Sequence, residues 1–250
     1  MDFLIITLAG SATGLVLGLL GSGGSIIALP ALLYLLKVPP KEAVAMSLGV
    51  VAVTAAVAAF DNWKRGNLDL KPAAVFALFG AVGTAAGSHI GAGLPVAVQL
   101  GGFALIMFTA AYRMLRRQPP AHAESLNQGG RWRIPASGVG VGMLTGTVGV
   151  GGGFLIVPAL SLFAGLPMKR AVGTSLAVVT VNAASGFLGY LGVVPIDYPV
   201  MAGFTAVTLA SSFAGTRLAH HLPQHTLKRI FGVFLVVTAS YIVLKSVITP

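Results

Sequence analysis

The stretch GLVLGLLGSGGSIIALPALLYLLKVPPKEAVAMS, residues 14–47, decides how this chain is organised, because it returns 128 residues later. The second copy reads GMLTGTVGVGGGFLIVPALSLFAGLPMKRAVGTS, residues 142–175. Both copies share, in one register, a glycine-rich break, a Pro-Ala-Leu triplet and a Lys-x-Ala-Val segment. Composition alone does not produce so many matches at one offset, so the chain carries an internal repeat.

The same register continues beyond the two copies, where Asp69 matches Asp197. The repeat therefore divides the chain into two homologous halves joined by a polar linker. The predicted boundaries are residues 1–115 for the first transmembrane repeat, 116–133 for a cytoplasmic linker and 134–250 for the second transmembrane repeat.

The composition indicates an integral membrane protein. Hydrophobic residues make up 56% of the chain and charged residues 9%, and the mean hydropathy is +0.89. A soluble domain of this length could not cover its surface with so few polar groups. The apolar runs do not alternate as barrel strands do, so the expected fold class is all-α, a polytopic bundle of eight to ten membrane helices.

The net charge of +10 does not indicate nucleic-acid binding, because the basic residues fall in short clusters between apolar runs, as the positive-inside rule expects. The chain has no cysteine, which excludes disulfides, thiolate metal sites and cysteine nucleophiles.

Each half contributes five apolar segments. The segment after each glycine break is shorter than the roughly 20 residues that a spanning helix needs. Each break therefore predicts a hairpin or discontinuous helix whose backbone is buried in protein or lines a wet cavity. The predicted segments are 3–20, 25–36, 43–60, 73–92, 96–115, 134–149, 153–165, 171–190, 199–219 and 226–246.

Loop charges predict that the two repeats are inverted. The arginine-rich stretch 113–133 is placed in the cytoplasm, and counting crossings from it places basic 64–71 inside but its equivalent, acidic 196–198, outside. The neutral corner 93–95 and its basic equivalent 221–228 also fall on opposite sides. We therefore expect a multi-pass membrane protein.

Inverted repeats with broken helices typically build one substrate site near the midplane. Helix N-termini supply unpaired amides and a positive dipole end, so the two breaks are expected to bind a small anion. The alternative is that the glycines only allow close helix packing, which we favour for Gly14 and Gly18 with their equivalents Gly142 and Gly146. The predicted substrate-binding residues at the breaks are Gly21, Ser22, Gly23, Gly24, Ser25, Gly149, Gly151, Gly152 and Gly153.

Four polar residues in the helices are further candidates for substrate binding: Ser47, Thr174, Ser175 and Asn182. The alternative for the serine and threonine hydroxyls is a hydrogen bond to a preceding carbonyl of their own helix, which we weight equally with substrate binding. An amide such as that of Asn182 needs partners within hydrocarbon, which favours a place in a cavity wall.

His89 and Arg217 are candidates for coupling or gating, although their places near segment ends favour anchoring at the membrane interface. Asp69 and Asp197 precede equivalent helices, where N-capping is expected. The histidines between residues 220 and 225 lie in a basic loop without carboxylates, so a solvated face is expected rather than a metal site.

At 21–30 and 149–158, each followed by Lys-x-Ala-x-x-x-Ser, the chain resembles the sulfite exporter family called TauE/SafE. The resemblance extends to a later corner, where Gly87 to Ile90 matches Gly215 to Leu218 ahead of Leu-Pro. It implies movement of small sulfur-containing or carboxylate anions across the cytoplasmic membrane.

The expected function is a transporter, and from the family an exporter, of small anions such as sulfite or organosulfonates, working by alternating access. An anion channel and a membrane receptor or assembly partner remain alternatives. Catalysis is not expected, because the break at 21–25 lacks the lysine of a phosphate-binding loop and residue 26 is Ile. No cofactor and no metal are expected. The expected partners are the anion and membrane lipid, with proton or ion coupling left open.

Overall fold

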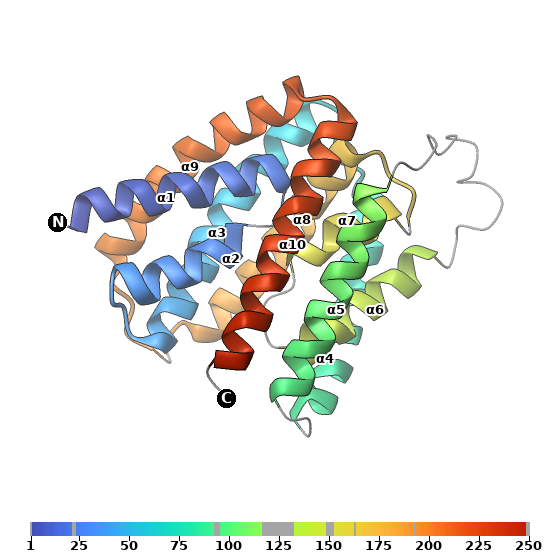
Figure 1. The fold of residues 1–250 in the computed structure, drawn as a ribbon. Coiled ribbons are helices and arrows are strands. Elements are labelled where there is room, and N and C mark those ends of the chain that lie inside the picture. Colours follow the sequence, from blue (N-terminus) through green and yellow to red (C-terminus); the bar gives the residue numbers. More distant parts are fainter. Residues whose placement is uncertain are drawn as a thin grey trace. The chain divides into compact units, whose positions relative to one another are not determined.

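A computed structural model describes residues 2–21, 24–92, 96–116, 133–148, 153–162, 164–192 and 194–248, and these residues contain helices and no strands (Figure 1). The predicted all-α fold class is confirmed. The elements are α1 (Asp2–Leu20), α2 (Gly24–Pro30), the π-helix η1 (Ala31–Leu35), α3 (Pro40–Lys64), α4 (Leu70–Ala92), α5 (Val96–Leu115), α6 (Arg133–Val148), α7 (Gly153–Leu162), α8 (Met168–Tyr190), α9 (Tyr198–His221) and α10 (Gln224–Ile248).

Every predicted apolar segment contains a helix, and several helices extend a few residues beyond the apolar run. Helix α3 begins at Pro40, three residues before the predicted start, because a proline in the first turn has no N–H that would need a partner there. Helix α9 begins at Tyr198, directly after Asp197, whose carboxylate accepts a hydrogen bond of 3.0 Å from the Val200 amide. The predicted N-cap at Asp197 is therefore confirmed.

The helices form two compact units, and each unit draws helices from both sequence halves. Unit 1 comprises Met1–Ala73 and Lys169–Leu222, and unit 2 comprises Ala74–Met168 and Pro223–Pro250. Unit 1 thus combines α1, α2, η1 and α3 with α9 and nearly all of α8. Unit 2 combines most of α4 with α5, α6, α7 and α10.

Unit 1 is centred on a close crossing of α1 and α9, which lie side by side in Figure 1. A Cβ at Gly14 would collide with the carbonyl oxygen of Thr208, and one at Gly18 with that of Ser212. Glycines here let the two backbones touch, which is how helices without a hydrophobic driving force between them gain packing energy. The packing interpretation of Gly14 and Gly18 is confirmed.

Unit 2 contains the equivalent crossing, between α6 and α4. Gly138 faces the Phe76 carbonyl oxygen, where a Cβ would lie 3.2 Å away, and also faces Phe79 and Gly80. Its repeat equivalent in unit 1, Gly10, faces Val207 and Thr208, which are themselves the equivalents of Phe79 and Gly80. The 128-residue repeat is therefore present in the packing as well as in the sequence.

The segments that follow the two breaks also end alike. In unit 1 the Val38 amide donates to the Leu32 carbonyl at 3.0 Å, with Lys37 at φ 54°. In unit 2 the Leu166 amide donates to the Leu160 carbonyl at 3.0 Å, with Gly165 at φ 69°. A long bond over a left-handed residue is a common way to close a helix. The repeat thus preserves this closure even where lysine replaces glycine.

The exposed surface is rich in large apolar side chains, with Leu78 and Leu105 each 67% exposed and Leu4 66%. Such side chains suit contact with lipid. By length and composition, two of the described helical stretches can cross a membrane, Lys41–Lys64 and Met168–Tyr190.

Gly14→Ala should lower the free energy of unfolding by about 1–3 kcal/mol, the usual cost of overpacking, because the added methyl group forces α1 away from the α9 backbone. Gly203→Ala is the matched control, since an added methyl group on this exposed part of α9 meets no atom within 4 Å. That variant should be neutral or slightly stabilised. Thermal unfolding of the detergent-purified proteins compares the two, and equal melting temperatures would contradict the crossing.

Candidate functional site

The first glycine break is a sharp end to α1. The Gly21 amide still donates to the Leu17 carbonyl at 2.8 Å, but Gly21 has a φ of +85°, and α2 begins three residues later at Gly24. Residues with a side chain avoid this left-handed backbone, so glycine is the residue that ends the helix here at little cost. The predicted discontinuous helix is confirmed at this break.

The break lies against α8 of the same unit. A Cβ built on Gly21 would lie 2.8 Å from the Ser175 Oγ and 2.9 Å from the Val172 carbonyl oxygen. The structure thus brings together two residues predicted for the substrate site, Gly21 and Ser175, that are distant in sequence. Gly24 and Ser25 follow in the first turn of α2, while Ser22 and Gly23 lie outside the described residues.

The candidate hydroxyls in the helices are bonded within their own helices. Ser175 Oγ donates to the Val172 carbonyl at 2.8 Å, and Ser47 Oγ donates to the Val44 carbonyl at 2.9 Å. The intrahelical alternative is therefore the arrangement in this structure. Ser175 would have to release Val172 before its hydroxyl could donate to an anion at Gly21.

Thr174 has a different hydrogen-bond partner from its neighbour Ser175. Its Oγ1 accepts a hydrogen bond of 3.1 Å from the Asp69 amide, so it ties the first turns of α8 to the loop between α3 and α4. The Asp69 carboxylate lies 3.7 Å from the Arg170 guanidinium. Thr174 thus fixes the loop beside the break, and its place in the substrate site stays a prediction.

The remaining predicted residues lie elsewhere. Asn182 is on an exposed part of α8, and Arg217 is exposed on α9, where its carbonyl oxygen lies 2.8 Å from His221 Nδ1. His89 belongs to α4. At the second break, α7 begins at Gly153, and the predicted residues Gly149, Gly151 and Gly152 lie outside the described residues.

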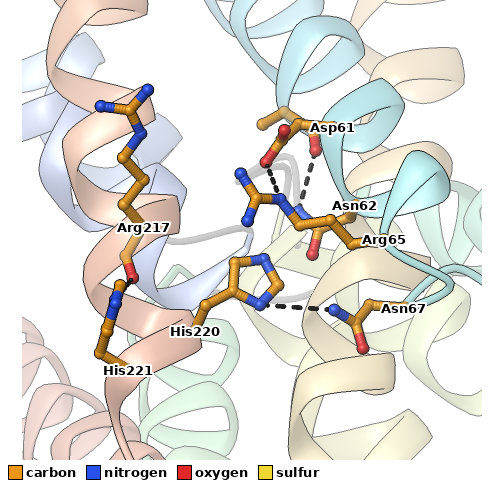
Figure 2. A network of polar contacts seen from close by, with 8 residues as sticks. Asp61, Asn62, Arg65, Asn67, Arg217, His220 and His221 are labelled. Carbon is orange, nitrogen blue, oxygen red and sulfur yellow. Dashed lines mark hydrogen bonds and ion pairs between the residues drawn. The ribbon is translucent and has the colours of Figure 1, made fainter.

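A group of polar contacts that the sequence did not indicate joins the end of α3 and the end of α9 (Figure 2), and Lys169 at the start of α8 also belongs to it. The Asn67 amide nitrogen lies 3.4 Å from His220 Nδ1. Lys169 Nζ donates to the His220 carbonyl at 2.6 Å. We call the group formed by Asp61, Arg65, Asn67, Lys169 and His220 the polar junction.

His220 departs from the solvated face that the sequence predicted for its loop. His221 and His225 are exposed, but His220 is half-buried because it lies on the inner side of the last turn of α9, beyond the apolar segment 199–219. Burial, reinforced by the positive charge of Arg65, lowers the pKa of His220 below its ordinary value of 6.5. The ring is therefore neutral near pH 7. A histidine inside a basic run gave no sequence signal for this burial.

The polar junction also bears on the predicted inversion. Asn67 contacts His220 at the C-terminal end of α9, whereas its repeat equivalent, Pro195, precedes the N-terminal end of the same helix. Equivalent loops thus lie at opposite ends of α9, which is the arrangement that inverted repeats require.

The helical fold, the exposed apolar side chains and the broken helix define the class as helical membrane proteins. Residues 6–242 match the family described as Sulfite exporter TauE/SafE, so the chain belongs to that family.

Relatives cover nearly the whole chain. A "Probable membrane transporter protein" of Xylella fastidiosa (strain 9a5c) is 34% identical over 97% of this chain and 96% of its own length. "Probable membrane transporter protein YdhB" of Bacillus subtilis (strain 168) is 25% identical, over 90% of this chain and 94% of its own. No solved structure matches the chain significantly. Family and relatives together identify the chain as a membrane transporter.

Gly21→Ala should be more destabilising than Gly66→Ala, although both glycines have a left-handed backbone, with φ of +85° and +70°. The conformational cost for an L-residue, about 1–2 kcal/mol, is common to both. Only at Gly21 does the added methyl group also meet Ser175 and Val172, since Gly66 has no atom within 4 Å. Melting temperatures of the two purified variants measure the difference. Equal losses would show that the break does not press against α8.

Proposed function

We propose that this protein is a multi-pass transporter of the cell inner membrane that exports small anions such as sulfite, organosulfonates or related organic anions. The observation that carries the proposal is the break after Gly21, held against Ser175, in a chain of the TauE/SafE family. The name of the family specifies sulfite, and a broken helix presents backbone amides suited to an anion.

The chemistry of the break fits an anion without a buried cation. Gly24 and Ser25 place backbone amides in the first turn of α2, which continues into η1, while Gly21, whose own amide bonds Leu17, makes the turn beside the anion. Ser175 adds a hydroxyl that is buried beside Gly21 and can exchange its intrahelical bond for one to an anion. In the proposal, Ser47, Thr174 and Asn182 also bind the anion, and the repeat-equivalent glycines Gly149, Gly151, Gly152 and Gly153 offer amides to an anion at the second break in the same way.

Alternating access is the proposed mechanism because inverted repeats supply two arrangements of similar energy that expose one site to either side. The loops at opposite ends of α9 support the inversion. An anion channel would use the same breaks without a closed state, and a receptor or assembly partner would bind an anion without moving it.

Uptake of 35S-labelled sulfite into proteoliposomes under an imposed proton gradient tests the proposal, with taurine and acetate as further substrates. Accumulation above the external concentration is expected, whereas simple equilibration would indicate a channel and binding without flux a receptor.

Gly24→Leu should abolish uptake while the protein still folds, because the larger side chain occupies the start of α2. Gly203→Leu, at an exposed and open position, should transport normally. Unchanged transport by Gly24→Leu would overturn the role of the break.

A further inference from the structure

We propose that Arg65 and His220 in the polar junction form a second binding site for a small oxyanion, separate from the glycine break. The site would capture the anion at the end of unit 1 that carries the basic loops. The inference rests on the proposed function, since the anion captured there is the one that the transporter moves.

The orientation of the His220 ring follows from its contact with Asn67. An amide nitrogen can only donate, so Nδ1, 3.4 Å from Asn67 Nδ2, is the acceptor. A neutral ring then carries its proton on Nε2. This Nε2 is buried and has no hydrogen-bond partner in the part of the chain that the structure describes.

The Arg65 guanidinium lies on the Nε2 side of the His220 ring (Figure 2). Its Nε donates to the Asp61 carboxylate at 2.8 Å, so this one nitrogen of the guanidinium already has an acceptor. Two donor groups, the guanidinium and Nε2–H, therefore face one another. A buried donor without an acceptor costs free energy, and an oxygen of an anion is the acceptor that would satisfy both groups.

The charges around the ring favour an anion over a cation. Lys169 from α8 and Arg65, the residue directly after α3, face His220, and His221 follows on the same helix as His220. The one carboxylate near the ring is Asp61. Asp61 is already paired with Arg65, and the other nearby carboxylate, Asp69, lies beside Arg170. A positive end with both carboxylates paired attracts anions from solution.

An anion would reach the site through movement of Arg65. The side chain of Arg65 is 42% exposed, so the guanidinium can swing into solvent, bind an oxyanion and return with it toward Nε2. The lowered pKa keeps His220 neutral near pH 7, so the ring contributes one hydrogen-bond donor while Arg65 contributes the charge.

Initial rates of 35S-sulfite uptake by inverted membrane vesicles test this site, because the end predicted to be cytoplasmic then faces the medium. Arg65→Gln and His220→Phe should each raise KM about tenfold and leave Vmax within twofold. Loss of capture weakens binding without touching the break.

Two controls separate the site from general effects. Arg217→Gln removes the same charge from an exposed position on α9, with its side chain directed away from His220 in Figure 2, and should change KM by less than twofold. Lys64→Gln removes the charge one residue before Arg65, where the exposed ammonium lies over the Phe60 ring, and should also change KM by less than twofold.

Either control raising KM as much as Arg65→Gln would overturn the site, showing diffuse attraction. The site would also be overturned if the wild type takes up sulfite and Arg65→Gln does so with the same KM. This variant still folds, because the side chain that it loses is exposed. Absence of wild-type flux for sulfite, taurine and acetate would instead overturn the proposed function.

Discussion

The contact of the α1 backbone with the α9 backbone is the constraint on which unit 1 depends. Gly14 and Gly18 have no side chain, so the carbonyl oxygens of Thr208 and Ser212 can lie directly against them. Because α1 belongs to the first repeat and α9 to the second, this contact interlocks the two halves of the sequence. It also fixes where α1 ends, and so places the Gly21 break beside Ser175 on α8. The α4–α6 crossing repeats the arrangement in unit 2, with Gly138 against Phe76.

Unit 1 contains two candidate anion sites, the glycine break and the polar junction. At the break, Gly21 contributes backbone in a conformation that only glycine adopts readily. Ser175 contributes a hydroxyl that donates to the Val172 carbonyl in this structure. The consecutive residues Thr174 and Ser175 link the break to the loop that carries Asn67, because Thr174 accepts a hydrogen bond from the Asp69 amide while Ser175 faces Gly21. A change in the loop after α3 would therefore be felt at the break through a single turn of α8.

Much of the fold could be predicted from the sequence, because hydrophobic length and glycine placement act locally. The helix bounds, the end of α1 at Gly21 and the N-cap at Asp197 all follow from residues within a few positions of each feature. The repeat could not show that α1 pairs with α9 across the two halves, since equivalent residues are not in general partners in space. The sequence also could not show that His220 is half-buried while His221 is exposed, because the side of α9 that is buried depends on the neighbouring helices. The predicted roles of Ser47 and Asn182 in substrate binding stay predictions for the same reason.

The central claim of this account is that the two repeats are inverted in the membrane. Because the chain has no cysteine, a single introduced thiol can be assigned to one side without interference. Pro195→Cys places an exposed thiol in the loop before α9, and Lys64→Cys places one at the end of α3, next to the loop that is its repeat equivalent. The most direct measurement is labelling of each variant in intact cells and in inverted vesicles with a maleimide that does not cross membranes. The account predicts that Pro195→Cys labels in cells and Lys64→Cys in inverted vesicles. Labelling of both thiols from the same side would contradict it.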